Sequence, residues 1–150
     1  MAEISGVEMN ESDVAEYLTR QGHGVLTFSG EKPYGVPISF AYDEQNNRCV
    51  FQLLSTALSR KAARLRESDA ATLIVYEWNT PDDWRSVILE GSLEEIEPES
   101  TDAIAAAEVF AEHASMIGSE IFAGPLEELD VQWYGLRIDA ISGYHSPFEF

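Results

Sequence analysis

Short apolar runs separated by hairpin-length turns are the feature that most constrains the fold of this chain. The most regular run, Tyr34–Tyr42, alternates large apolar residues with small ones, which is the two-residue period of a strand with two unlike faces. Six runs are expected to be strands: Gly24–Ser29, Tyr34–Tyr42, Arg48–Leu54, Ala71–Trp78, Trp84–Ile96 and Gln132–Ser142. Because short hairpins connect many of them and regular βαβ crossovers are lacking, the sequence predicts a mostly antiparallel sheet or barrel.

Two or three helices complete the predicted pattern. They are expected over Glu11–Arg20, from Ser55 or Thr56 to about Glu67, and over the alanine-rich segment Ser100–Ala114. In the first helix, Ser12 is the predicted cap and Gly22 the predicted stop. No repeat or linker divides the chain, and a length of 150 residues favours a single core. We therefore predict one α+β domain over residues 1–150.

The charge balance narrows the range of partners. The chain has 27 Asp and Glu residues against 9 Lys and Arg residues, which gives a formal net charge of −18. Affinity for phosphate backbones and anionic membranes comes from clustered Lys and Arg, so neither nucleic acid nor a membrane is an expected partner. Self-repulsion of this acidic surface is screened by salt, which favours a halophilic source.

Other residue types exclude several kinds of site. Cys49 is the single cysteine, which excludes an internal disulfide and a multi-cysteine zinc site. The three histidines, His23, His113 and His145, lie far apart and have no metal-ligand spacing, so no metal is expected. No apolar run approaches the roughly 18 residues of a membrane span, and the acidic N-terminus does not resemble a signal peptide. A cytoplasmic location is therefore expected.

A cluster of basic residues is the strongest chemical signal. Four of the nine basic residues lie within seven positions: Arg60, Lys61, Arg64 and Arg66. Basic side chains near a helix start oppose the helix dipole by about 0.3 to 1 kcal/mol each, which indicates a compensating anion. Nearby hydroxyl groups belong to Ser55, Thr56 and Ser59. Together with free helix amides, Arg60 and Lys61 can form a phosphate pocket, whereas Arg64 and Arg66 are more simply explained as a solvated face.

The strand Tyr34–Tyr42 carries a second signal on its face of small residues. Pro37, Ser39 and Ala41 share this face, opposite Val36, Ile38, Phe40 and Tyr42. A flat ring system can approach a strand closely only where the side chains are small. The alternative is that this face packs on a neighbouring layer, and the residues alone do not decide between the two.

The segment Leu53–Ala62, with its Ser-Arg-Lys-Ala core, resembles the flavin-phosphate segment of pyridoxamine 5′-phosphate oxidase and its relatives, the FMN-binding split barrels. Lys32-Pro33-Tyr34, Tyr42-Asp43-Glu44 and the strand Trp84–Gly91 are similar to that family in order and spacing. The resemblance covers roughly residues 20 to 96. It implies a six-stranded split β-barrel that binds FMN.

The resemblance assigns two groups of residues to the cofactor. The phosphate and ribityl chain would be held by Leu54, Ser55, Ser59, Arg60 and Lys61. The isoalloxazine ring would lie along Val36, Pro37, Ile38 and Ser39 and be reached by Ser86. In this family the flavin lies between the subunits of a homodimer, so Tyr144 would contact a ring bound mainly by the partner chain.

The implied activity is that of an FMN-dependent oxidoreductase acting on a small molecule. The chain departs from the oxidase itself at two places that bind phosphate. Val36 or a neighbour replaces a strand arginine, and the C-terminal residues Tyr144–Phe150 lack the arginine and histidine that bind the substrate phosphate. Pyridoxine phosphate oxidase activity is therefore not expected, and no residue has an obvious acid or base role. The alternative is a non-catalytic module of the same fold that binds a flavin, a deazaflavin or haem.

Overall fold

The computed structural model describes residues 6–29, 34–54, 69–97, 100–113 and 131–147. The elements of this part are β1 (Val7–Glu8), α1 (Glu11–Gln21), β2 (His23–Phe28), β3 (Tyr34–Ser39), β4 (Ala41–Asp43), β5 (Arg48–Leu54), β6 (Ala70–Thr80), β7 (Asp83–Ile96), α3 (Thr101–His113) and β8 (Val131–His145). The predicted helix between Ser55 and Glu67 lies outside the described residues. The predicted helices at either side of it match α1 and α3.

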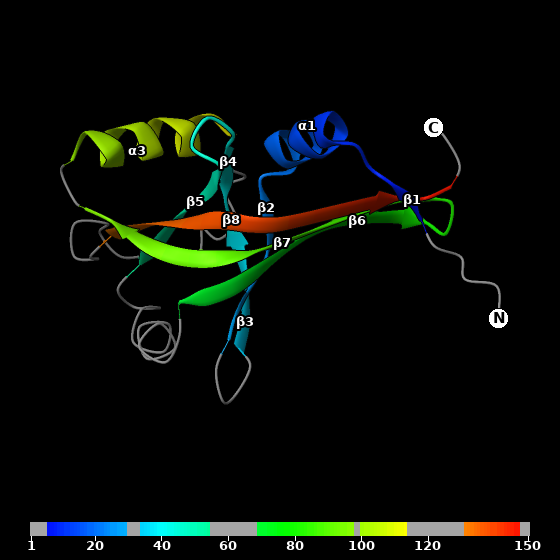
Figure 1. The fold of residues 1–150 in the computed structure, drawn as a ribbon, viewed down its shortest axis with the longest axis horizontal. Helices are drawn as coiled ribbons and strands as arrows, with labels where there is room; N and C mark the ends of the chain where they lie inside the picture. The colour runs from blue at the N-terminus through cyan, green and yellow to red at the C-terminus, as the bar shows by residue number, and fades with distance from the viewer. Residues whose placement is uncertain (1–5, 30–33, 55–68, 98–99, 114–130, 148–150) are drawn as a thin grey trace, which may run out of the picture.

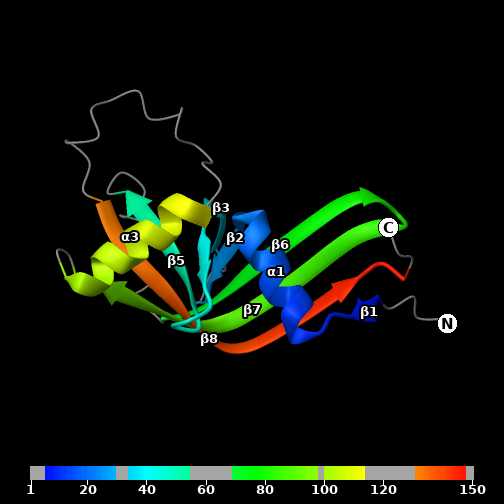
Figure 2. The ribbon, with the colours of Figure 1, turned by 90° about the horizontal axis from the view of Figure 1, so that it is seen from above.

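The strands form one curled antiparallel sheet. Its order is β3-β2-β6-β7-β8-β5-β4, and β1 pairs with the end of β8. The strands at the two ends of this order, β3 and β4, are consecutive in the chain, so the sheet curls round towards itself (Figures 1 and 2). Figure 1 shows α1 and α3 on the same side of the long strands β7 and β8. The α+β class and the split-barrel architecture are thus confirmed.

In the described part of the chain the sheet has eight strands, where the sequence predicted six. One added strand is β1, whose two residues are too short for a hydrophobic pattern. The other comes from a break in the predicted strand Tyr34–Tyr42, because Phe40 lies between β3 and β4 and its N–H donates to the carbonyl of Gly22. The chain thereby leaves β2 and begins to pair with β5.

The cap of helix α1 lies two residues before the predicted one. Asn10 has an extended backbone, and its side-chain oxygen accepts a hydrogen bond of 2.8 Å from the N–H of Asp13. The prediction of Ser12 as the cap was wrong, because Ser12 already lies inside the first turn. The stop at Gly22 is confirmed by its left-handed φ of 68°, which favours glycine.

The main core lies between α1 and the inner face of the sheet. Its fully buried members include Leu18 of α1, Leu26 of β2, Leu73 of β6, Leu89 of β7 and Leu136 of β8. Burial also raises the pKa of the Cys49 thiol far above its usual value, which suits a packed side chain and not a nucleophile.

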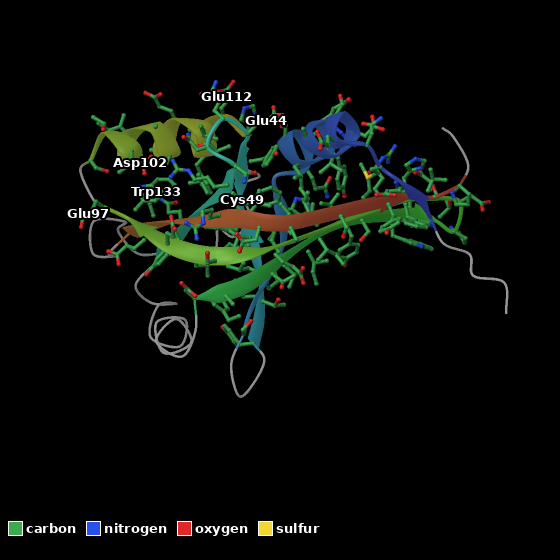
Figure 3. All side chains as sticks on the ribbon, in the orientation of Figure 1. Glu44, Cys49, Glu97, Asp102, Glu112 and Trp133 are labelled. Carbon is green, nitrogen blue, oxygen red and sulfur yellow. The ribbon has the colours of Figure 1, made fainter. Side chains whose placement is uncertain are left out.

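A smaller core lies beneath α3. It contains Val50, Ile96, Ala103 and Ala106, with Trp133 packed against it (Figure 3). The ring of Trp133 meets that of Phe110 edge to face at 5.3 Å. This second cluster fixes the helix that the alanine-rich segment predicted.

An ion-pair network ties α3 to the β4–β5 hairpin. Arg48 donates to both carboxylate oxygens of Asp102, at 3.1 and 2.8 Å, and its Nε donates to Asp43 at 3.1 Å. The side chains of Arg48 and Asp43 are only 13% and 6% exposed. Their burial makes this network a firm attachment for α3.

A bulge interrupts the long antiparallel pair β7–β8. The register of the pairing shifts between Glu90 and Gly91. A Cβ atom on Gly91 would overlap the carbonyl oxygen of Arg137, so the two backbones approach too closely here for any side chain. Among the described residues, no helix is both long and apolar enough to cross a membrane.

Candidate functional site

The outer face of the sheet, opposite the core, carries most of the expected ring contacts. Alternate residues of a strand face opposite sides, so the strand register identifies which side chains share this face. One row across five strands consists of Pro37, Val25, Ile74, Ile88 and Ser142. We call the face that contains this row the outer face.

Ser86 and Tyr144, two expected ring contacts from distant parts of the chain, are direct neighbours on the outer face. The register of β7 and β8 pairs them, and it pairs Tyr76 of β6 with Ser86 from the other side. Tyr76 is 59% exposed and Tyr144 is 42% exposed, while the smaller Ser86 is half-buried. The structure thus places a serine between two exposed phenol rings.

Tyr76 is a residue that sequence reasoning missed. The signal that could have identified it is the strand period, since Tyr76 lies two residues from Ile74 and so shares its face. Its place beside Ser86 depends on the register of β6 against β7. The sequence contains no marker for that register.

The four expected residues of β3 divide between the two faces. Ile38 is buried in the core, and the partly buried Val36 packs against the core. Pro37 is exposed and Ser39 is half-buried, and both point to the outer face. The predicted face of small residues is therefore present over β3, but Ala41 does not belong to it, because Ala41 lies in β4 beyond the break at Phe40 and is fully buried.

The residues expected at the phosphate lie outside the described part of the chain. These are Ser55, Ser59, Arg60 and Lys61, together with their neighbours Thr56, Arg64 and Arg66. Leu54 ends β5, where its backbone pairs with Val131. The phosphate half of the site therefore stays a prediction from the sequence.

The outer face carries an ion pair beyond Glu90, between Glu94 of β7 and Arg137 of β8 at 3.2 Å, but its part around Ser86 and Tyr144 is nearly free of charge. The described side chains of that part are those of His23, Val25, Thr27, Gly35, Pro37, Ser39, Thr72, Ile74, Tyr76, Trp78, Trp84, Ser86, Ile88, Glu90, Ala140, Ser142 and Tyr144. Within this set Glu90 is the only carboxylate, and Lys and Arg do not occur. In a chain with 27 acidic residues, a face of this composition is suited to binding uncharged surface.

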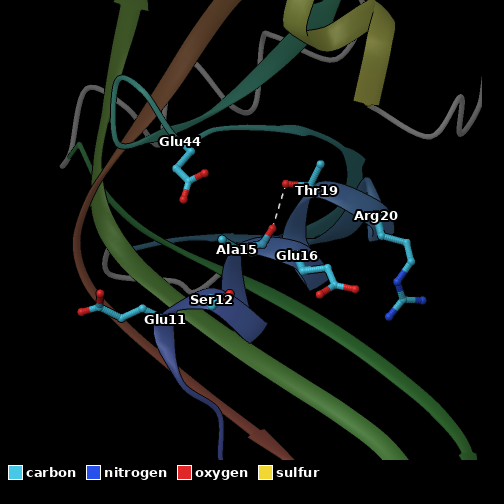
Figure 4. Close-up of a pocket in the computed structure, with 7 residues that line it drawn as sticks. All are labelled: Glu11, Ser12, Ala15, Glu16, Thr19, Arg20 and Glu44. Carbon is cyan, nitrogen blue, oxygen red and sulfur yellow. Dashed lines mark hydrogen bonds between the residues drawn. The ribbon is translucent and has the colours of Figure 1, made fainter.

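The grooves on the side of α1 have the opposite character. One is lined by Glu11, Ser12, Ala15, Glu16, Thr19, Arg20 and Glu44 (Figure 4), and a neighbouring groove by Glu8, Glu11 and Glu44 with Tyr42. The hydroxyl of Thr19 is already used, since it donates to the carbonyl of Ala15 at 2.8 Å. Carboxylates repel a phosphate group, so neither groove fits an anionic ligand. Within the described ranges, no group of acidic, histidine or cysteine side chains could hold a metal ion.

Comparison with known proteins gives a family match and several similar folds. The family model described as pyridoxamine 5′-phosphate oxidase matches residues 10–145. No curated protein matches the chain. An FAD-binding protein from Mesorhizobium loti has a TM-score of 0.73 at 20% sequence identity, over 93% of this chain and 96% of that chain.

Two proteins from Mycobacterium smegmatis have the same fold. An FAD-binding protein has a TM-score of 0.69 at 14% identity, over 95% of this chain and 100% of that chain. An FAD- and haem-binding protein has a TM-score of 0.65 at 18% identity, over 99% of this chain and 77% of that chain. At these identities the likeness is one of fold.

Proposed function

Because the chain belongs to the pyridoxamine 5′-phosphate oxidase family, we propose that it binds a flavin and catalyses hydride transfer with a small-molecule substrate. The observation that carries this proposal is the outer face. Two ring contacts expected from the family resemblance, Ser86 and Tyr144, are neighbours there, and β3 presents Pro37 and Ser39 on the same side. Similar folds that are named as flavin-binding proteins add support.

The residues of β3 fit a flat ring system. Gly35 and Pro37 are exposed and Ser39 is half-buried, so the side chains on this stretch are small. A ring laid over them can come close enough to meet backbone groups of the strand. Bound there, a flavin supplies the hydride chemistry, and the protein's part is to place the ring and exclude water.

We propose FMN as the flavin, on the strength of the basic cluster. Arg60 and Lys61 beside Ser55 and Ser59 provide charge-assisted bonds for one phosphate monoester. FAD is the competing ligand, since similar folds carry it in their names. Phosphate contacts make FMN bind more tightly than riboflavin. The affinity for FAD shows whether the site also has room for the adenylate group that FAD has and FMN lacks.

We propose that a second copy of the chain packs on the outer face and covers it. Exposed large apolar side chains gather there, namely Tyr76, Trp78, Ile88 and Tyr144. Two chains of charge −18 repel each other, so they can associate stably only through a surface with few charges. The part of the outer face around Ser86 and Tyr144 is such a surface, and a two-fold dimer would bury it on both copies.

The substrate is expected to lack a phosphate group. Binding of a phosphate ester relies on Lys, Arg or helix amides, and the described residues of the outer face around Ser86 and Tyr144 include neither Lys nor Arg. This agrees with the C-terminal residues Tyr144–Phe150, which lack the arginine and histidine that bind the substrate phosphate in the oxidase. An uncharged or cationic small molecule suits the face better than pyridoxine phosphate.

The test is a titration of the flavin-free protein with FMN, FAD and riboflavin at high salt. The proposal expects FMN to bind most tightly, and a bound flavin to be bleached by a reduced nicotinamide. The mass in solution should be about twice the 16.7 kDa of one chain. A protein that binds none of the three flavins, or a monomer that binds FMN tightly, contradicts the corresponding part of the proposal.

The second candidate is a binding module without turnover. The observation in its favour is the scarcity of acid and base groups on the outer face around Ser86 and Tyr144, where the described titratable side chains besides the tyrosines are those of His23 and Glu90. A flavin that binds tightly but is not bleached by any donor would favour this candidate. A red protein with a haem spectrum would favour haem as the ligand, as in the second M. smegmatis protein.

A further inference from the structure

Tyr76 lies between the two groups of expected ring contacts. Ser39 of β3 pairs with His23 of β2, and Ser86 of β7 pairs with Tyr76 of β6. The β2–β6 ladder ends at the pair of Val25 with Ile74, and extending its register by two residues puts His23 level with Tyr76. One row of the outer face therefore runs through Ser39, His23, Tyr76, Ser86 and Tyr144.

Because of the spacing of the strands in this row, a ring bound there is expected to contact Tyr76. Neighbouring strands are about 4.8 Å apart, so Ser39 and Ser86 are separated by roughly 14 Å and Tyr76 lies one strand from Ser86. A planar ring that contacts both serines of one chain has to cross β2 and β6. A ring that is bound mainly by the partner chain and covered by Ser86 and Tyr144 still has Tyr76 as the direct neighbour of Ser86.

The phenol of Tyr76 is available for such a contact. Its side chain is 59% exposed on a face where its neighbours in the row are a serine and a histidine. Aromatic rings attract one another in stacked or edge-to-face arrangements beyond the area that they bury. A tyrosine here can therefore orient an aromatic ligand, which the small residues of β3 cannot do.

We propose that Tyr76 is a positioning residue that contacts the flavin ring. This inference rests on the proposed function, because it assumes a flavin on the outer face. It assigns Tyr76 to the ring and not to the phosphate. Loss of the phenol should therefore weaken binding of FMN and riboflavin by the same factor, about two- to tenfold.

The test compares two variants with the parent protein. Tyr76→Leu keeps apolar bulk for packing and removes the aromatic ring, and Ile104→Ala changes a residue of α3 that is 58% exposed and lies outside the row that contains Tyr76. The measurements are the affinities for FMN and riboflavin, the fluorescence lifetime of the bound flavin, and the mass in solution. A phenol in contact with a flavin quenches its fluorescence, so Tyr76→Leu should lengthen the lifetime while Ile104→Ala changes nothing.

Three results would overturn the inference. Unchanged affinity and lifetime in Tyr76→Leu would show that the phenol does not touch the ring. A dimer that dissociates in Tyr76→Leu would assign the residue to subunit packing. A parent protein that binds no flavin would refute the proposed function and the inference together, which separates that failure from the other two.

Discussion

Arg60 and Lys61 are the residues on which the choice of cofactor depends. FMN differs from riboflavin only by its phosphate, so a site built around that phosphate must discriminate between the two ligands. Charge-assisted hydrogen bonds contribute about 1.5 to 3 kcal/mol each. The pair is therefore the most informative target for substitution.

Replacing Arg60 and Lys61 together by Gln should weaken FMN binding by at least about tenfold and leave riboflavin binding nearly unchanged. Isothermal titration with both ligands measures the difference. The matched control replaces both Arg64 and Arg66, which we assign to a solvated face, by Gln. This control should alter FMN affinity by no more than a few-fold. Equal FMN affinity in the two double variants would refute the phosphate site.

Gly91 lies where the backbones of β7 and β8 approach too closely for a side chain. A Cβ atom there would overlap the carbonyl oxygen of Arg137, which is backbone and cannot turn aside. Gly91→Ala should therefore lower the free energy of unfolding by about 1 to 3 kcal/mol, measured by urea denaturation. Gly35→Ala is the control, because its Cβ would meet a movable methyl group of Thr27 at 3.1 Å. A larger loss in the control would contradict the assignment of close backbone approach to Gly91.

At the scale of elements, one guanidinium group joins α3 to the β4–β5 hairpin. Arg48 is largely buried and is shared between a buried carboxylate, Asp43, and an exposed one, Asp102. Breaking a buried ion pair by removing one partner costs about 3 to 5 kcal/mol, whereas an exposed pair contributes up to about 1 kcal/mol. The two carboxylates should therefore respond very differently to substitution.

Asp43→Asn should destabilise the protein by several times as much as Asp102→Asn, measured by thermal unfolding at pH 7. In Asp102→Asn, the amides of α3 should exchange hydrogen faster while those of β6 and β7 do not. Similar losses in both variants would show that the attachment of α3 does not distinguish the two carboxylates.

Acid should loosen α3 through the same contact. The hydrogen bonds from Arg48 lower the pKa of Asp102 below its ordinary value. A carboxyl group with a depressed pKa in the folded state stabilises that state fully above about pH 4, and the contribution is lost as the pH falls through the lower, folded-state value. Hydrogen exchange in α3 should therefore accelerate below pH 4 in the parent protein, and this acceleration should be absent from Asp102→Asn.

The sequence predicted most elements and missed specific junctions. Strands such as β6 and β7 and the helices α1 and α3 have strong local periodicity, and their ends fell within a few residues of the predicted ones. Phe40 breaks a strand through a backbone hydrogen bond to Gly22, and no side-chain pattern records that bond. Asn10 and Ser12 are both good helix caps, so only the observed backbone geometry distinguishes them.

The family resemblance identified some residues of the candidate site in advance. It could not identify residues whose place in the site is set by how the strands pair. Ser86 and Tyr144 are 58 positions apart in the sequence, and the strand register makes them neighbours. The register of β6 against β7 likewise places Tyr76 beside Ser86, and no sequence motif contains Tyr76. The nearly uncharged part of the outer face around Ser86 and Tyr144 also depends on which residues share a side of the sheet.

At the scale of the whole molecule, the charge of −18 sets the response to salt. Self-repulsion destabilises the folded chain and opposes its association, and salt screens both effects, with a Debye length of about 10 Å at 0.1 M. The melting temperature should therefore rise as KCl increases from dilute to molar concentrations, measured by calorimetry. A flat or falling melting temperature would contradict the halophilic interpretation.

The position of β8 has a consequence for how the protein is made. It follows the other strands in the chain, yet it lies between β7 and β5 and also pairs with β1, the first strand. A nascent chain that has emerged only as far as α3 can pair β3-β2-β6-β7 and β4-β5 as two separate pieces, each with an open edge. Synthesis proceeds at about 5 to 20 residues per second, so these edges stay exposed for seconds before β8 joins them. The sheet is closed only once β8 has emerged, so the open strand edges need protection during that interval.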